Sequence, residues 1–260
     1  MTFQTLSLEK RGAADWLTLD RPDAMNILNA AMVEELLRYF TQLEADRSVR
    51  VVVLRAAGAN FCAGLDLKDM AARFSTLDAA GILATQRSLS RITLAMRRCP
   101  QPVVCLLQGS ASGGGFAFAL ASDIRYCTPD ARMNAAFIQV GLSGCDVGVS
   151  FLLPRLVGSS VAAEMLLTGK FLSADRAREI GLVSKIVAAE QMEAAASELV
   201  ASLLKASPIG LALTKQGLNT NLTAPSLEAA IEIEDRQQAL LASQPEFMAS
   251  IQAFLAKRPR

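Results

Sequence analysis

The chain of 260 residues contains no histidine, and this absence restricts its chemistry more than any other feature of composition. Without an imidazole it cannot form a Ser-His-Asp triad, and it lacks the most common protein ligand for zinc. Its five cysteines, at positions 62, 99, 105, 127 and 145, form no C-x-x-C pair and no metal-finger spacing. We therefore expect reduced thiols in or near the core, no metal site, and no histidine-dependent hydrolysis.

Net charge and hydropathy exclude two further classes of partner. The 26 basic and 25 acidic residues give a net charge of +1, so no general attraction toward nucleic acid or an anionic membrane is expected. No apolar run approaches the ~18 residues of a membrane-spanning helix. Residues 1–8 lack the basic flank and apolar stretch of a signal peptide. These features predict a globular cytoplasmic protein that binds neither nucleic acid nor membrane.

Hydrophobic periodicity predicts an α/β chain that becomes helical towards its C-terminus. Residues 3–9 and 16–20 alternate as strands of an opening hairpin, and residues 30–46 repeat apolar side chains at helical spacing. The apolar runs Val51–Leu54 and Val103–Leu107 are typical of strands that are buried on both faces. Further expected elements are a helix over 78–98, strands over 124–127 and 132–137, helices over 159–167 and after Ser173, a strand over 182–187, and helices over 191–205, 208–221, 226–243 and 245–256.

Two glycine-containing stretches follow predicted strands and carry the strongest functional signal. The first is residues 61–68, and the second is residues 108–115, which end in three consecutive glycines. Gly64 permits a sharp turn, and the glycine run leaves backbone N–H groups uncovered where a helix begins. Because two converging N–H donors can stabilise negative charge on a carbonyl oxygen, the pair predicts an oxyanion hole. The spacing of Gly109 and Gly113–Gly115 does not match the G-x-G-x-x-G of a dinucleotide site.

These and other motifs occur in an order that resembles the crotonase, or enoyl-CoA hydratase/isomerase, superfamily over essentially the full length of the chain. The matching segments are Leu19–Pro22 with Met25-Asn26, Ala63–Lys68, Gly109 with Gly113–Gly115, Ala121–Arg125, Leu153–Gly158 and Gly181–Val183. The resemblance implies a crotonase-like spiral of repeated ββα units and acyl-CoA thioester substrates, with no cofactor besides the coenzyme A of the substrate. Together with the composition, it divides the chain into an acyl-CoA-binding core over residues 1–190 and a helical oligomerisation region over residues 191–260. The expected assembly is a homotrimer or a dimer of trimers.

The resemblance also implies roles for individual residues. The backbone N–H groups of Leu65 and Gly114 would hold the thioester oxygen as it becomes an enolate. The implied substrate-binding positions are Ala63, Asp66, Lys68, Phe137, Phe254 and Lys257. Two interpretations stay open for the cationic and C-terminal positions. Lys68 could meet a CoA phosphate or be a solvated surface residue, and Phe254 and Lys257 could serve a neighbouring subunit's CoA site or belong to a packed helix and a basic tail.

The chain departs from hydratases of this family at both positions of their catalytic glutamates. Ala117 and Phe137 stand there, and neither side chain can transfer a proton. Addition of water needs a base for the water and an acid for the α-carbon, so ordinary hydration is in doubt. The nearby acid is Asp146, where dienoyl-CoA isomerases and chlorobenzoyl-CoA dehalogenases of the family carry a carboxylate at a similar point. A nucleophilic, dehalogenase-type role would need the histidine that this chain lacks.

We therefore predict that Asp146 moves a proton between carbons of a bound enolate, provided that apolar neighbours raise its pKa from ~3.9 toward neutrality. Leu65, Gly114 and Asp146 are the predicted catalytic residues, and double-bond isomerisation is the favoured reaction. Two alternatives are hydration with non-standard residues such as Asp69, and a catalytically silent acyl-CoA-binding protein. Asp146 could also be an N-cap or turn residue, and Cys145 is expected to be a small buried hydrophobe rather than a nucleophile.

Overall fold

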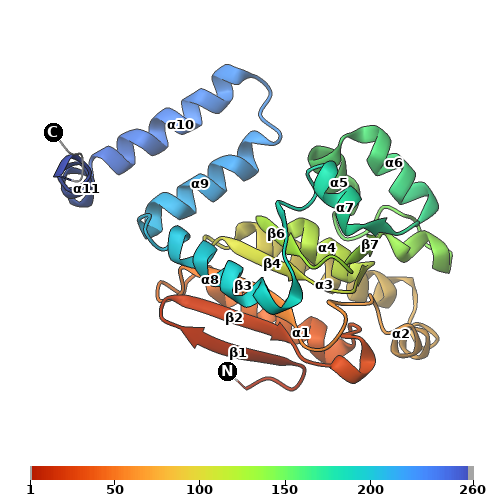
Figure 1. The fold of residues 1–260 in the computed structure, drawn as a ribbon. Coiled ribbons are helices and arrows are strands. Elements are labelled where there is room, and N and C mark those ends of the chain that lie inside the picture. The colour runs from red at the N-terminus through yellow and green to blue at the C-terminus, as the bar shows by residue number, and fades with distance from the viewer. Residues whose placement is uncertain (1, 257–260) are drawn as a thin grey trace. The chain divides into compact units, whose positions relative to one another are not determined.

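The computed structural model describes residues 2–256, which fall into two compact units that divide after Lys205 (Figure 1). The first unit extends beyond the expected boundary at residue 190. It does so because helix α8, Met192–Leu203, packs against strands β3 and β4 through Ala196 and Val200. The remaining helices of the chain form the second unit.

A six-stranded sheet of order β1-β2-β3-β4-β6-β9 forms the centre of the first unit. β1 and β2 form the expected antiparallel hairpin, and the other neighbouring strands pair in parallel. A smaller sheet has the order β5-β7-β8. The strands are β1 Leu6–Arg11, β2 Ala14–Leu19, β3 Val51–Ala56, β4 Val103–Leu107, β5 Ser110–Ser112, β6 Ile124–Cys127, β7 Arg132–Asn134, β8 Leu172–Ser173 and β9 Lys185–Ile186.

Successive chain segments repeat a ββα unit, which confirms the expected crotonase-like α/β fold. After β3, Cys62 bridges to Ala111 of the smaller sheet before the chain enters helices α2 and α3. β4 is likewise followed by β5 and helix α4, and β6 by β7 and the 3-10 helix η2. The bounds of these helices are α2 Leu67–Phe74, α3 Ala79–Arg98, α4 Gly114–Ala121 and η2 Ala136–Val140.

Both faces of the large sheet are covered, as the continuous apolar strands predict. Val52 and Leu54 of β3 lie in the main core with helix α1, Ala30–Leu43, and with α3 and α4. Val51 and Val53 point to the opposite face and pack with α8, which crosses the sheet in Figure 1. The other helices of this unit are η1 Pro22–Ala24, α5 Val149–Val157, α6 Ser159–Thr168, α7 Ala174–Glu179 and η3 Ala189–Gln191.

Two strands are shorter than expected, and tertiary hydrogen bonds explain both differences. The strand expected over 132–137 stops at Asn134, because β8 pairs only with the first two residues of β7 and the Asn134 carbonyl accepts the Gly113 N–H. The chain then turns into η2. The strand expected over 182–187 is reduced to β9, because the N–H groups of Leu182 and Val183 donate to the Ala177 carbonyl and complete the turn after α7.

The second unit contains helices α9 Pro208–Asn221, α10 Leu227–Ala242 and α11 Pro245–Ala256. Their bounds match the sequence-based expectation within one residue at each end, because Ser207 and Ser226 cap α9 and α10 with their side-chain oxygens. Lys257 lies outside the described residues. No single helix within the described range is long and apolar enough to cross a membrane, although the bent pair Ala189–Leu203 with Pro208–Asn221 reaches that length and composition in combination.

Candidate active site

The first glycine motif is held by hydrogen bonds on two sides. Cys62 N–H donates to the Ser110 carbonyl at 3.0 Å, and the Cys62 carbonyl accepts the Ser112 N–H at 2.9 Å. On the other side, Leu28 bonds to both neighbours of Leu65, as donor to Gly64 at 2.8 Å and as acceptor from Asp66 at 3.0 Å. In such a parallel bridge, the N–H of Leu65 points away from Leu28. It donates no hydrogen bond to any of residues 2–256.

The second potential donor is the N–H of Gly114 at the start of α4. Gly113 adopts a φ of 51°, outside the helix, and Gly114 is the first helical residue. An N–H in this position has no acceptor within its own helix. Gly114 also finds no acceptor elsewhere in the described part of the chain. The positive end of the α4 dipole lies at the same point, and it favours negative charge.

The three glycines allow α4 to pack directly on the first motif. A Cβ atom on Gly115 would lie 2.5 Å from the Cys62 carbonyl oxygen, and one on Gly114 would lie 2.6 Å from Cδ1 of Leu28. A Cβ atom on Gly113 would lie 3.8 Å from the Cα of Gly64. The two motifs therefore touch, and each carries one backbone N–H that has no partner in the described part of the chain.

The Met25-Asn26 pair holds the loop of the first motif through hydrogen bonds. The fully buried Asn26 side chain donates from Nδ2 to the carbonyls of Ala57 and Asn60, at 2.8 and 2.9 Å. The Met25 carbonyl accepts the N–H of Ala63 at 3.1 Å. Met25 and Asn26 have φ values of 51° and 52°, an uncommon conformation for residues other than glycine. This sequence motif therefore fixes the loop that carries Ala63 and Leu65.

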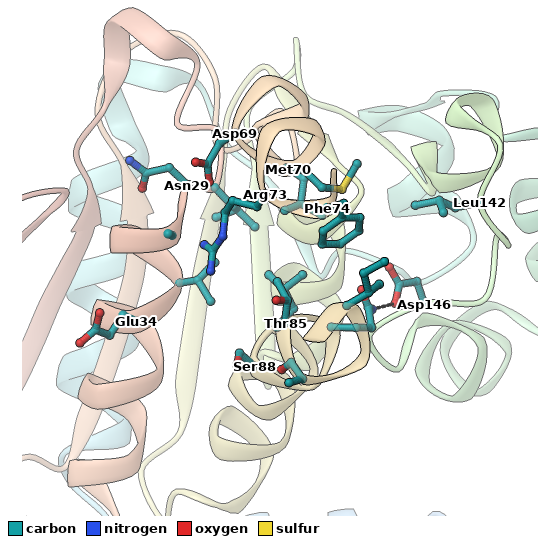
Figure 2. A pocket seen from close by; sticks show the side chains of 18 of the residues that line it. Asn29, Glu34, Asp69, Met70, Arg73, Phe74, Thr85, Ser88, Leu142 and Asp146 are labelled. Carbon is teal, nitrogen blue, oxygen red and sulfur yellow. Dashed lines mark hydrogen bonds between the residues drawn. The ribbon is translucent and has the colours of Figure 1, made fainter. Parts of the chain in front are cut away.

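A cavity of about 670 Å³ lies beside Leu65, between α1, α2, α3 and the loop over residues 142–146 (Figure 2). Most of its wall is apolar, with Val33 and Leu37 from α1 and Met70 and Phe74 from α2. Polar side chains interrupt this wall at Asn29, Glu34, Asp69, Arg73, Gln86 and Asp146. Its size and its mixed lining are typical of a small-molecule site.

Asp146 lies in this cavity together with Leu65, although the two residues are far apart in the sequence. Its half-buried carboxylate accepts hydrogen bonds at Oδ1 from the Val147 N–H, at 2.7 Å, and from Nε2 of Gln86. Burial raises the pKa of Asp146 above its ordinary value, and these two hydrogen bonds oppose the rise. Helix α5 begins after Gly148, so the Asp146 side chain does not cap it. The carboxylate is thus available to the cavity.

Several other predicted residues have structural contacts instead of a place in the cavity wall. Asp66 caps α2, where its Oδ1 accepts the Asp69 N–H at 3.2 Å. Lys68 is exposed in the first turn of the same helix. Phe137 is buried, and its ring lies 3.5 Å from where a Cβ atom of Gly113 would be. Ala117 is fully buried within α4.

Phe254 lies in α11 of the second unit, and 63% of its surface is exposed. A role for Phe254 in binding remains a prediction.

Cys145 was expected to be buried, and this expectation was wrong. It is exposed and lines the cavity, because the loop over 142–146 runs along the surface, whereas the other four cysteines are buried. Burial raises the pKa of the thiol of Cys62, which belongs to the first motif, to about 12. Among residues 2–256, no three His, Cys, Asp or Glu side chains come together in a group that could hold a metal ion.

Sequence reasoning missed helix α2 and the role of Gln86. Met70, Arg73 and Phe74 of α2 line the cavity, but this short helix follows the glycine motif without a strong periodic signal. Gln86 falls at helical spacing with Leu89, so its place on the inner face of α3 was available from the sequence. Its contact with Asp146, 60 positions away, depends on the fold.

Comparisons of the sequence and of the structure with known proteins all find members of one protein family. The sequence model of the enoyl-CoA hydratase/isomerase family matches residues 9–260. A probable enoyl-CoA hydratase of Mycobacterium tuberculosis is 39% identical over 231 residues, which cover 84% of this chain and 78% of that protein. The 1,2-epoxyphenylacetyl-CoA isomerase of Escherichia coli is 33% identical, with 93% and 92% covered.

Two further relatives extend the comparison to another reaction and to a solved structure. The mitochondrial Δ(3,5)-Δ(2,4)-dienoyl-CoA isomerase of Mus musculus is 32% identical, with 92% of this chain and 76% of that protein covered. The crystal structure of an enoyl-CoA hydratase from Mycobacterium smegmatis superposes with a TM-score of 0.91 at 33% identity. The superposition covers 98% of this chain and 97% of that one.

Proposed function

Because this chain belongs to the enoyl-CoA hydratase/isomerase family, we propose that it isomerises a carbon–carbon double bond in an acyl-CoA thioester. The observation that carries the proposal is the placement of Asp146 in one cavity with Leu65. The positions where the family's hydratases carry glutamates hold Ala117 and Phe137, and both side chains are apolar and buried. Asp146 is therefore the best candidate for the proton-transfer group.

In the proposed reaction, the thioester oxygen accepts hydrogen bonds from the N–H groups of Leu65 and Gly114. The ionised Asp146 removes a proton from one carbon of a 3-enoyl or dienoyl group, and the electron pair moves onto the thioester as an enolate. The same carboxyl then returns the proton to a more distant carbon, and the double bond has moved. Loss of one such N–H donor typically costs ~10²–10³ in rate.

The electrostatics of Asp146 support this shuttle. A carboxyl group that both accepts and returns a proton works best when its pKa approaches the working pH. Burial raises the pKa of Asp146 in this direction. The mouse dienoyl-CoA isomerase among the relatives supports the same class of reaction.

Hydration by a non-standard pair of acids is the second candidate, because Asp69 and Glu34 also line the cavity. In this case Asp146 and one of these carboxylates would activate the water and protonate the α-carbon. The hydratases among the relatives support this candidate.

We also propose that the second unit mediates assembly into a homotrimer or a dimer of trimers. Helix α10 buries none of its residues within the described chain. Large apolar side chains are exposed on all three helices of the unit, at Leu218, Leu222, Leu227, Ile231, Met248 and Phe254. This exposed apolar surface supports an interface with another chain. A monomeric mass by light scattering would contradict the proposal.

The test is incubation of the pure protein in D₂O with saturated, 2-enoyl, 3-enoyl and dienoyl CoA thioesters, followed by mass spectrometry of the products. Isomerisation predicts deuterium gain or double-bond migration that Asp146→Asn abolishes. A gain of one water would establish hydration instead. Binding without any change in the thioesters would indicate a catalytically silent acyl-CoA-binding protein.

A further inference from the structure

The two oxygens of the Asp146 carboxylate have different surroundings. Oδ1 accepts both the Val147 N–H and the Gln86 amide, and the second bond is drawn dashed at Asp146 in Figure 2. Oδ2 accepts no hydrogen bond from any residue in the described range 2–256. Because an ionised carboxylate is acceptor-only, the oxygen without protein donors is the one that can take a proton from a ligand.

Helix α3 fixes the position of the Gln86 side chain. Gln86, Leu89 and Thr93 follow one another at helical spacing, and Leu89 and Thr93 are buried. A Cβ atom on Gly148 would lie 3.4 Å from Cγ2 of Thr93, so this face of α3 packs against the turn that follows Asp146. Gln86 is itself half-buried, which limits the rotamers of its amide.

The turn after Asp146 contributes the second donor and also has an unusual backbone conformation. Val147 has a φ of 38°, which is a genuine outlier for a β-branched residue. The Val147 N–H donates to the side chain of the preceding residue. Strained residues of this kind persist where the surrounding structure imposes them, and they cluster at functional sites.

We propose that Gln86 is a positioning residue, which together with the Val147 N–H anchors Oδ1 of Asp146 and leaves Oδ2 to exchange the proton with the substrate. This inference rests on the proposed function of Asp146. It adds a residue on α3 to the site and names the oxygen that reacts.

Other charged groups do not supply this anchor. The titratable side chains that share the cavity with Asp146 are Cys145 on its own loop, Asp69 and Arg73 on α2, and Glu34 on α1. Within the described structure, none of them forms a hydrogen bond or an ion pair with Asp146. The Gln86 amide stabilises the ionised form, so its removal should raise the pKa of Asp146.

The test compares Gln86→Leu, which removes the donor, with Gln86→Glu, which keeps the shape but adds a second carboxyl. The matched control is Arg87→Leu on the exposed side of α3, outside the cavity wall. The carboxyl ¹³C resonance of Asp146 is titrated in protein labelled with [¹³C]aspartate, and its assignment comes from its loss in Asp146→Asn. Melting temperatures verify folding. The acidic limb of the kcat/KM pH profile is recorded in parallel.

We expect the pKa of Asp146 to rise by about one unit in Gln86→Leu, as expected for one lost hydrogen bond to a charged group. It should rise further in Gln86→Glu, where two carboxyls share the site. The acidic limb should move to higher pH with them, with kcat reduced and KM retained. Arg87→Leu should match the wild type.

An unchanged titration of Asp146 in both folded Gln86 variants would overturn the inference. Failure of the proposed function gives a different result, because Asp146→Asn would then match the wild type, either in full turnover or in the absence of turnover. The carboxyl titration needs no turnover, so it decides the role of Gln86 in either case.

Discussion

The site has two sides that are built differently. The backbone side consists of residues 62–65 and 113–115, whose N–H groups are positioned by main-chain hydrogen bonds and by glycines in close contact. The side-chain side consists of α2, α3 and the loop over 142–146, and it places its functional groups at the ends of side chains. The first side offers only backbone groups, which glycines at 113–115 allow to approach closely. The second depends on which residue stands at each position.

In the proposed reaction, this difference separates activation of the thioester from the choice of reaction. Two backbone N–H groups can stabilise an enolate whatever happens next to the proton. The fate of that proton is set by carboxyls such as Asp146, and side chains can change without disturbing the fold. A chain with Ala117 and Phe137 can therefore keep the backbone side while it performs a different reaction from a two-glutamate hydratase.

The largest effect is expected from disturbing the backbone side with Gly115→Ala. The new Cβ atom would lie 2.5 Å from the Cys62 carbonyl, and backbone on one side must move. We expect a loss of about 1–3 kcal/mol in the free energy of unfolding, and a fall of ~10²–10³ in kcat as the Gly114 N–H is displaced. Leu167→Ala is the control, because this residue of α6 is 76% exposed. Wild-type kcat in Gly115→Ala would show that the close packing is dispensable.

A smaller effect, on the affinity for thioesters, is expected from removing an apolar side chain of α2 that lines the cavity. Phe74→Ala removes a half-buried ring from the cavity wall, and Leu67→Ala removes an exposed side chain of the same helix that does not line the cavity. Loss of about 1.5 kcal/mol of apolar contact predicts a roughly tenfold higher Kd for thioesters with large acyl groups. Isothermal titration with short and long acyl chains measures this. Equal losses for both chain lengths would place the acyl group elsewhere.

Asp146→Asn should stabilise the protein at neutral pH while it removes the proposed activity. The pKa of Asp146 is raised above 3.8 by burial, so the native state binds this proton more tightly than the unfolded state. Its contribution to stability is therefore present at low pH and is lost as the pH rises through the folded-state pKa. Calorimetry should show a higher Tm than wild type at neutral pH and no difference near pH 3.8. A lower Tm at neutral pH would contradict the burial of an ionised group.

The smallest effect is expected in the reactivity of two cysteine thiols, one on each side of the site. Cys145 on the loop is exposed, whereas Cys62 is fully buried beneath the backbone side, with a pKa raised to about 12. Iodoacetamide should modify Cys145 alone in the native protein, and a bound acyl-CoA should slow the reaction because this residue lines the cavity. Peptide mass spectrometry identifies the modified cysteine. Modification of Cys62 in the native protein would show that the backbone around residues 62–65 moves enough to expose this thiol to the reagent.

The same division explains what could be predicted from the sequence. The bounds of α9 follow from Ser207 and Pro208 at its first turn, and the buried strand β3 follows from the apolar run that begins at Val51. The contact between the two glycine motifs was also predictable, because each follows a strand of one sheet. The first two are local signals, and the third follows from two such signals in neighbouring strands.

The side-chain side was less predictable, because its contacts join distant segments. The sequence places Gln86 on the inner face of α3 but cannot show that its amide meets Asp146. Exposure of Cys145 and the raised pKa of Asp146 likewise depend on how the loop packs on α3. The carboxylate itself was identified from the family resemblance, because dienoyl-CoA isomerases and chlorobenzoyl-CoA dehalogenases carry a carboxylate at a similar point.

The most direct test of the division is made on Asp146→Asn with one reactive thioester. Its affinity for the enzyme and the exchange of its α-proton with D₂O are measured on the same samples. The account predicts an unchanged Kd and a loss of exchange of ~10²–10⁴, the typical contribution of a general acid–base group. Exchange at the wild-type rate in Asp146→Asn would contradict it, because another group would then be moving the proton.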